Sequence, residues 1–214
     1  MNKKTFPKVT IIMRGYNYQQ VNLIMETLEG KEEQFAIEIT LNSPDVFETL
    51  QKIIKQYGEK FWIGAGTVLN LQNAKDAVEA GAQFILSPVM LSKEVLDYCK
   101  QKNVMSVPAG MTPTEVYTLF QNGADVVKLF PATSLDRGHF KAMQGPLGEL
   151  SLMAVGGINA GNANDFLNKG ASYVGIGSGI FEKEDVLNND KEAVKKSLAV
   201  FEETVFGTTK EVAR

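Results

Sequence analysis

Eight short runs of β-forming residues follow one another along the chain, and segments with a helical spacing of apolar residues separate them. The interval between successive runs is roughly two dozen residues, which is the length of a compact βα unit. The runs cover residues 9–14, 35–41, 61–66, 83–88, 104–109, 125–131, 150–155 and 172–177. Such regular alternation favours parallel strands joined by helices.

The helical segments carry apolar stripes with recognisable start and stop signals. The clearest stripes are Val21, Ile24, Met25 and Leu28, then Val46, Leu50, Ile53, Ile54 and Tyr57, and finally Val194, Leu198, Phe201 and Val205. Ser43-Pro44 predicts one helix start, and Thr112-Pro113 with Glu115 predicts another. Glycines predict several helix ends, at Gly58, Gly81, Gly123 and Gly170.

Eight βα units whose strands are apolar on both faces favour a closed (β/α)8 barrel, the TIM-barrel class of α/β folds, over an open doubly wound sheet. No glycine-rich dinucleotide fingerprint follows the first run, which also disfavours the open alternative. The chain has 214 residues, near the low end for a complete barrel, and 44% of them are hydrophobic. We therefore predict one barrel domain over residues 1–207 and a polar tail over residues 208–214.

Charge and cysteine content limit the possible partners. A formal net charge of -3 disfavours nucleic acid and anionic membranes as partners, so an anionic partner is expected to be small. Arg14 interrupts the first apolar run before a signal peptide or membrane span is complete. The single cysteine, Cys99, cannot form an intramolecular disulfide, which favours a cytoplasmic protein. With one histidine, His139, no nitrogen and sulfur metal cage is expected.

Lys128 lies inside an apolar strand, where an isolated cation is costly to bury. Alternation places Val126, Lys128 and Phe130 on one face of that strand. Val127 and Leu129 lie on the opposite face, and if that face contacts the helices, Lys128 points into the barrel. A desolvated lysine has a lowered pKa and can attack a ketone as a neutral amine. The alternative is a structural ion pair with a carboxylate.

Glu38 has the same kind of position in the second run. It shares one face with Ala36 and Thr40, whereas Ile37 and Ile39 lie on the other face. A carboxylate would then share the barrel interior with the lysine. Such a pair can act as nucleophile and proton shuttle, because Schiff-base chemistry requires proton transfers at a leaving water and at the substrate carbon. A buried ion pair without chemistry is again the alternative.

Glycine clusters follow the seventh and eighth runs. Gly156 and Gly157 follow the seventh run, and Gly177 with Ser178 follows the eighth. Barrels commonly bind phosphate at these two strand ends, where glycine lets backbone N–H groups approach the anion. Arg14 ends the first run and could contact a carboxylate or phosphate, or form a salt bridge at the rim.

The order of several short motifs points to a known family. The motifs are Glu-Ile-Thr-Leu at 38–41, Gly-Ala-Gly-Thr-Val-Leu at 64–69, Ser-Pro at 87–88, Met-Thr-Pro-Thr-Glu at 111–115, Lys-Leu-Phe-Pro at 128–131 and Gly-Gly-Ile at 156–158. Together they resemble the family of 2-keto-3-deoxy-6-phosphogluconate aldolases and 4-hydroxy-2-oxoglutarate aldolases. The resemblance extends from about Val9 to Phe181.

The resemblance implies a role for each matching position. Lys128 takes the Schiff-base role, and Glu38 takes the general acid/base role. The positions implied to line the substrate pocket are Thr67, Pro88, Phe130, Gly156, Gly157, Gly177 and Ser178. The family is metal-independent and needs no organic cofactor, and by analogy the chain is expected to form a homotrimer.

Two segments depart from the gluconate type. Many of its members have arginine at the position of Asn42 and Pro-Thr at 154–155, where this chain has Ala-Val. These segments resemble the related 2-keto-3-deoxy-6-phosphogalactonate aldolases more closely. Val155 lacks a hydroxyl that could contact a substrate hydroxyl, which bears on discrimination between C4 epimers. Val89, where many members have glycine, bears on the pocket shape.

The sequence therefore predicts a class I aldolase, a carbon-carbon lyase. It would cleave a 2-keto-3-deoxy-6-phospho sugar acid, of the phosphogalactonate or phosphogluconate type, to pyruvate and glyceraldehyde 3-phosphate. Three alternatives stay open at this point. They are a 4-hydroxy-2-oxoglutarate aldolase, a phosphate-binding barrel isomerase or decarboxylase without an imine, and a non-catalytic barrel that binds sugar phosphates.

Overall fold

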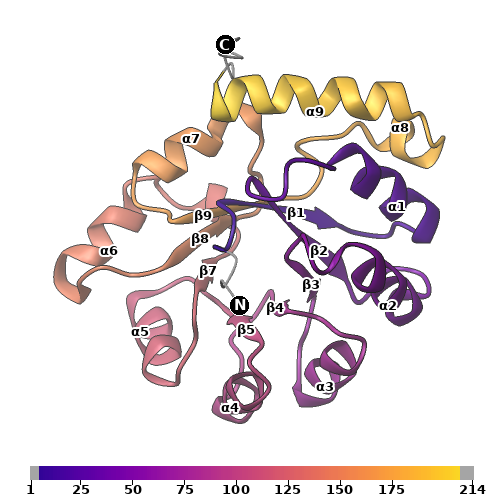
Figure 1. Cartoon of the computed structure of the whole chain (residues 1–214). Coiled ribbons are helices and arrows are strands. Elements are labelled where there is room, and N and C mark those ends of the chain that lie inside the picture. Colours follow the sequence, from indigo (N-terminus) through magenta and orange to yellow (C-terminus); the bar gives the residue numbers. More distant parts are fainter. Residues whose placement is uncertain (1–4, 208–214) are drawn as a thin grey trace, which may run out of the picture.

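A ring of parallel strands surrounded by helices forms the body of the molecule (Figure 1). The computed structural model describes residues 5–207. Within that range it has nine strands: β1 (Val9–Met13), β2 (Phe35–Thr40), β3 (Ile63–Gly66), β4 (Phe84–Leu86), β5 (Met105–Val107), β6 (Ala109–Gly110), β7 (Val127–Leu129), β8 (Leu152–Val155) and β9 (Tyr173–Ile176). The predicted tail at 208–214 lies outside the described residues.

All eight predicted runs contain strands, and the fifth run is divided in two. Pro108 separates β5 from β6, because proline has no N–H to donate to a sheet ladder. The sheet order is β5-β4-β3-β2-β1-β9-β8-β7-β6, and neighbouring strands pair in parallel. Since the two ends of this order belong to one chain segment, the sheet curls into a nearly closed barrel. The prediction of a (β/α)8 barrel is confirmed.

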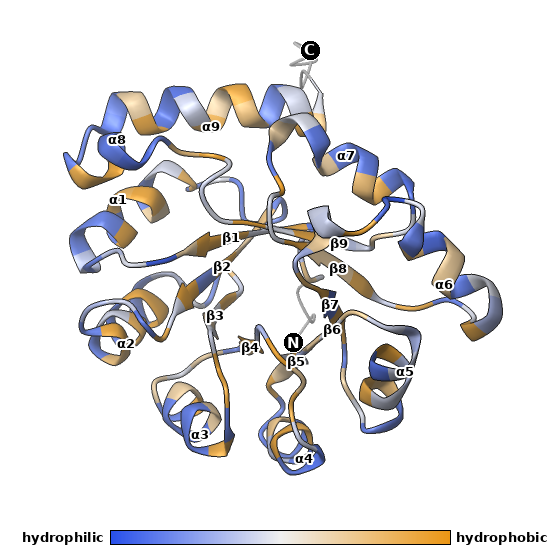
Figure 2. Ribbon diagram, turned by 180° about the vertical axis from the view of Figure 1, so that it is seen from behind, coloured by the Kyte–Doolittle hydropathy of each residue, from blue (hydrophilic) through white to orange (hydrophobic). Residues whose placement is uncertain are grey.

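Helices pack around the outside of the barrel, with their hydrophobic positions turned toward the strands (Figure 2). They are α1 (Tyr18–Thr27), α2 (Val46–Tyr57), α3 (Leu71–Glu79), α4 (Lys93–Gln101), α5 (Pro113–Gln121), α6 (His139–Leu147), α7 (Ala160–Asn168), α8 (Lys183–Leu187) and α9 (Lys191–Phe206), with a 3-10 turn, η1, at Ala132–Ser134. No helix in the described range is long and apolar enough to cross a membrane.

The local start signals were predicted with mixed success. Thr112 and Glu115 form the expected capping box at the start of α5. Ser43-Pro44 stands directly before α2, as predicted, but the N-cap is Asp45, which makes no side-chain cap bond. Ser43 is turned to the neighbouring loop instead, where its Oγ accepts a hydrogen bond from the Gly15 N–H at 2.8 Å. Its side chain thereby supports the loop that follows β1.

Two separate apolar layers lie on the two sides of the strands. The outer layer fills the space between strands and helices and includes Ile37, Val127 and Leu129. The inner layer fills the barrel and includes Ala36 and Val126. The predicted alternation of faces is therefore confirmed for β2 and for the segment of β7. Glu38, two positions after Ala36, and Lys128, two positions after Val126, consequently point into the barrel.

An aromatic cluster closes the end of the barrel at which the strands begin. Phe6 makes edge-on ring contacts with Trp62, Phe84 and Tyr173, at centroid distances of 5.5, 5.3 and 5.5 Å. These rings come from three different strand regions, so one N-terminal side chain joins opposite walls of the barrel. Solvent and ligands therefore enter from the other end, where the strands terminate.

Candidate active site

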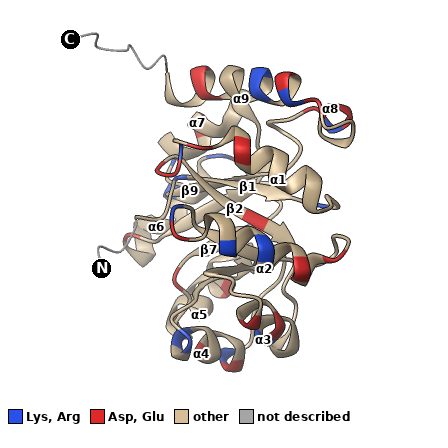
Figure 3. Ribbon diagram, turned by 45° about the vertical axis from the view of Figure 1, so that its right-hand side comes forward, with Lys and Arg blue, Asp and Glu red and all other residues tan. Residues whose placement is uncertain are grey.

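Lys128 and Glu38 share the interior of the barrel. Lys128 is on β7 and Glu38 is on β2, which stand on opposite walls in the strand order. Their side chains converge from those walls, and only 5% of Lys128 and 2% of Glu38 is exposed. Figure 3 shows charged positions mainly on helices and loops, and an acidic position on β2. The structure therefore places both groups where sequence alternation predicted them.

Burial shifts the pKa of both groups toward neutrality. Desolvation raises the pKa of Glu38 to about 7, although the positive charges of Lys128 and Arg14 oppose this shift. Desolvation also lowers the pKa of Lys128 to about 8, where the charge of Glu38 opposes the shift and that of Arg14 adds to it. Both groups can therefore gain or lose a proton near neutral pH, as a nucleophilic amine and a proton shuttle require.

The amine of Lys128 and the carboxylate of Glu38 are not hydrogen-bonded to each other. Among the described residues, no hydrogen bond or ion pair within 4 Å joins Lys128 to Glu38. The Glu38 Oε2 atom is buried without a hydrogen-bond partner, which is costly unless a substrate or water completes it. Lys128 Nζ lies 5.0 Å from the centre of the Phe130 ring, at the wall of the adjoining pocket.

Glycine at position 66 leaves room for the carboxylate of Glu38. A Cβ atom built on Gly66 would overlap Oε1 and Cδ of Glu38. Gly66 is the last residue of β3, the strand next to β2, and its backbone is not in the left-handed region. The absence of a side chain therefore serves the packing of Glu38 rather than a turn. This role of Gly66 was not predicted, because only Thr67 was singled out within the motif at 64–69.

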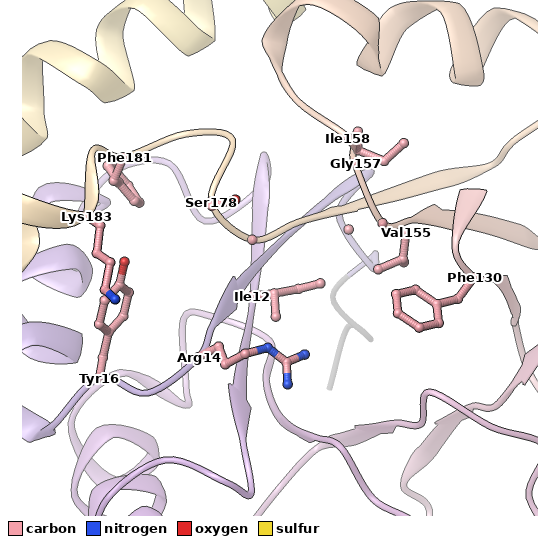
Figure 4. A pocket seen from close by; sticks show the side chains of 13 residues that line it. Ile12, Arg14, Tyr16, Phe130, Val155, Gly157, Ile158, Ser178, Phe181 and Lys183 are labelled. Carbon is pink, nitrogen blue, oxygen red and sulfur yellow. The ribbon is translucent and has the colours of Figure 1, made fainter. Parts of the chain in front are cut away.

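A pocket of about 370 Å³ opens at the C-terminal ends of β7, β8, β9 and β1. Seven of the predicted substrate-binding residues line it: Arg14, Phe130, Val155, Gly156, Gly157, Gly177 and Ser178. It is also lined by Ile12, Tyr16, Ile158, Gly175, Phe181 and Lys183 (Figure 4). Chain segments distant in sequence therefore meet at this rim, as expected for parallel strands that end at one face.

Thr67 and Pro88 do not line this pocket. They follow β3 and β4, which stand beside β2 on the wall that carries Glu38. Thr67 and Pro88 therefore lie on a different part of the barrel wall from the glycine loops that follow β8 and β9. Thr67 has a left-handed backbone, with φ of 60°, immediately after β3. Such strain in a residue other than glycine is frequent at functional sites.

The loop after β8 is held against the loop after β7. Gly156 and Gly157 have φ values of 98° and 75°, which favour glycine. A Cβ on Gly156 would lie 3.0 Å from the Pro131 Cα, so the two loops pack closely. The Thr133 hydroxyl donates a hydrogen bond to the Gly156 carbonyl at 3.2 Å. These contacts keep the backbone of the glycine loop at the pocket wall, where it can bind an anion.

Arg14 brings a positive charge to the same pocket. It follows Ile12 on the inward face of the chain after β1, and both residues line the pocket. In Figure 4 its guanidinium group points toward the side of the pocket that contains Phe130. The bond from the Gly15 N–H to Ser43 Oγ supports the adjoining backbone. Among the described residues no ion pair holds Arg14 at the rim, and its side chain faces the pocket.

Tyr16 and Lys183 are pocket residues that the sequence did not identify. Tyr16 lies two positions after Arg14, and Lys183 lies beyond the glycine cluster that follows β9. No family motif covers either position. The one sequence signal was that Lys183 is a cation a few residues after the glycine cluster at 177–178. In the described part of the chain, no group of three or more His, Cys, Asp or Glu side chains is arranged to hold a metal ion.

Comparisons with known proteins agree with this geometry. The family model for KDPG and KHG aldolases matches residues 2–197. The 2-dehydro-3-deoxy-6-phosphogalactonate aldolase of Escherichia coli strain K12 is 29% identical over 171 residues, which cover 79% of this chain and 83% of that protein. A probable 2-dehydro-3-deoxy-6-phosphogalactonate aldolase of Rhizobium meliloti is 31% identical over 173 residues, 80% of this chain and 81% of the relative.

A solved structure extends the comparison to the fold and the chemistry of a relative. It is a KDPG aldolase from Legionella pneumophila, with pyruvate captured at low pH as a covalent carbinolamine intermediate. The two chains are 26% identical and superpose with a TM-score of 0.79, over 91% of this chain and 94% of the other.

Proposed function

The chain belongs to the KDPG and KHG aldolase family, and on this premise we propose that Lys128 and Glu38 carry out its aldol cleavage. The protein is a class I aldolase, which is a carbon-carbon lyase. The observation that supports the residue assignment best is that a buried amine, whose pKa is lowered to about 8, shares the barrel interior with a buried carboxylate. Family membership disfavours the non-catalytic barrel and the imine-free isomerase or decarboxylase.

The proposed reaction begins at the keto group of the substrate. The neutral amine of Lys128 attacks carbon 2, and the carbinolamine loses water after Glu38 supplies a proton to the departing oxygen. In the resulting iminium ion, a base removes the proton of the C4 hydroxyl and the C3–C4 bond breaks. The electron pair of that bond moves toward the iminium nitrogen, so an enamine forms and an aldehyde leaves.

Two further steps would return the enzyme to its starting state. A proton is delivered to carbon 3 of the enamine, and Glu38, a buried acid whose pKa is raised to about 7, would supply it. Water then hydrolyses the imine, which releases pyruvate and restores the amine of Lys128. When the substrate is a 2-keto-3-deoxy-6-phospho sugar acid, the aldehyde is glyceraldehyde 3-phosphate. Atoms and protons balance without a cofactor.

Reductive trapping tests the role of Lys128. Treatment with pyruvate and borohydride should attach a reduced pyruvate group to Lys128, as located by peptide mass spectrometry. Lys128→Met should remain unlabelled under the same conditions. An unlabelled wild-type protein, under conditions that label a control class I aldolase, would count against the imine.

We further propose a phosphogalactonate-type substrate in preference to the phosphogluconate type. Val155 lines the pocket, and the two phosphogalactonate aldolases described above support this preference as relatives. Pyruvate release from the two C4 epimers should therefore favour the galactonate, and Val155→Thr should shift the ratio toward the gluconate. An unchanged ratio in this variant would refute the role of Val155. A 4-hydroxy-2-oxoglutarate substrate is the alternative and is measured in the same assay.

We also propose that the glycine loops and the wall beside Glu38 bind opposite ends of a phosphorylated substrate. Gly156, Gly157, Gly177 and Ser178 would bind the phosphate through their backbone N–H groups. Thr67 and Pro88 would contact the pyruvate portion, on the wall that carries Glu38.

We propose a cytoplasmic homotrimer as the working form of the enzyme. Exposed apolar side chains in neighbouring βα loops support self-association: Leu69 after β3, and Val89 and Met90 after β4. Met90→Asp should therefore reduce the mass measured by light scattering to that of a monomer, whereas Val200→Asp on α9 should not. A monomeric wild-type protein would contradict the trimer.

A further inference from the structure

One end of the active-site pocket carries a lysine that no family motif covers. Lys183 lines the pocket together with Tyr16 and Phe181, and Figure 4 places these three at the end opposite Phe130. Phe130 marks the end nearest the amine of Lys128, because that amine lies 5.0 Å from its ring. The pocket therefore extends from the proposed imine to Lys183.

The charges along the pocket favour an anion with more than one negative charge. Arg14 and Lys183 are its two cationic lining residues, and no lining residue is acidic. Neither cation takes part in an ion pair within the described residues. The acidic neighbours of Lys183 in sequence, Glu182 and Glu184, do not line this pocket. An anionic ligand would therefore meet the positive charges without a competing carboxylate.

Tyr16 adds a hydroxyl group at the same end. It is half-buried, and burial raises its pKa above the ordinary value for tyrosine. The hydroxyl thus keeps its proton at neutral pH and can donate a hydrogen bond. Tyr16 and Lys183 come from opposite ends of the chain, after β1 and after β9, which are paired strands. Their meeting is a consequence of barrel closure.

We propose that Lys183, assisted by the Tyr16 hydroxyl, binds the distal phosphate of the substrate and selects phosphorylated over unphosphorylated 2-keto acids. This inference rests on the proposed function, because it takes the keto group of the substrate to be held at Lys128. The phosphate is on the last carbon of such a substrate, at the far end from the keto group. In the proposed function the glycine loops would bind the same group through the backbone, whereas Lys183 would supply a full charge to it.

Steady-state kinetics with matched substrates test the proposal. The substrates are 2-keto-3-deoxygalactonate with and without its 6-phosphate, and the variants are Lys183→Met and Tyr16→Phe. Lys183→Met should raise KM for the phosphorylated substrate about tenfold with little change in kcat, because the lost contact is present in both ground and transition states. Its kcat/KM for the unphosphorylated substrate should stay within about twofold of wild type. Tyr16→Phe should act in the same direction, less strongly.

Two controls separate this inference from the proposed function. Lys75→Met removes an exposed lysine on α3, outside the pocket, and should leave both substrates unaffected. Inorganic phosphate should inhibit wild type competitively and Lys183→Met more weakly. Equal losses on both substrates, or no change on either, would overturn the role of Lys183 while pyruvate trapping on Lys128 stays intact. Failure of that trapping in wild type would overturn the proposed function itself.

Discussion

A methyl group at position 66 should inactivate the enzyme without unfolding it. The Cβ of Gly66→Ala would overlap the carboxylate of Glu38 and lie 2.7 Å from its Cγ, whereas ordinary contacts are 3.4–4 Å. The carboxylate must therefore move by roughly 1 Å or more to restore a normal contact. A displacement of this size costs about 100-fold in rate for a positioned catalytic group. The atoms that must move form the end of a flexible side chain, so the barrel should survive.

The assay is pyruvate release from the phosphorylated substrate, with thermal unfolding measured in parallel. We expect kcat to fall by about 100-fold in Gly66→Ala, while borohydride still traps pyruvate on Lys128. Gly145→Ala on α6 is the matched control, because no heavy atom lies within 4 Å of its added Cβ. A kcat within about threefold of wild type would refute the reasoning, because the displaced carboxylate would then not be needed for the proton transfers.

Three further predictions concern charge and packing. Glu38→Gln should lower kcat by about 10²–10³-fold, because the group that transfers protons is lost. Pyruvate trapping on Lys128 should persist, because the carboxylate had raised the pKa of that amine and its removal favours the neutral form. Loss of trapping at neutral pH would contradict this. Arg14→Met should move the midpoint of pH-dependent trapping upward, since a cation that lowers the pKa of Lys128 is removed; an unchanged midpoint would argue against the coupling. Phe6→Ala should lower the free energy of unfolding, measured in urea, by about 2–3 kcal/mol, because the ring that joins Trp62 to Tyr173 on the opposite wall is lost. A change below about 0.5 kcal/mol would refute the role of Phe6 in closing this end of the barrel.

Local patterns in the sequence predicted much of the barrel. Strand alternation identified which faces of β2 and β7 point inward, because a period of two depends on neighbouring residues alone. The capping box of α5 was predicted for the same reason, since its partners Thr112 and Glu115 lie within one helical turn. Gly81, Gly123 and Gly170 have positive φ at helix ends, whereas Gly58 ends α2 with a φ of -64°.

Features that depend on distant segments were not visible in the sequence. The local sequence around Ser43 predicts a helix cap, yet its hydroxyl accepts a hydrogen bond from the Gly15 N–H, which joins the loops after β2 and β1. Pro108 lies inside a strand-like run, and its division of β5 from β6 became evident only when the two strands paired with different neighbours. At Ser43 a tertiary contact replaced the interaction that local propensity favoured, whereas Pro108 interrupts the ladder because it has no N–H.

The sequence by itself determined the order of βα units and the inward direction of Lys128 and Glu38, because hydrophobic periodicity records burial along the chain. Tertiary structure alone decided how far these two groups depart from their ordinary pKa values, since desolvation depends on what surrounds them in space. It also decided that Gly66 makes room for a carboxylate on the next strand, and that Lys183 and Tyr16 share one pocket with Arg14. Closure of the barrel brings these residues together from distant parts of the chain, and no local sequence pattern predicts which distant residues become neighbours.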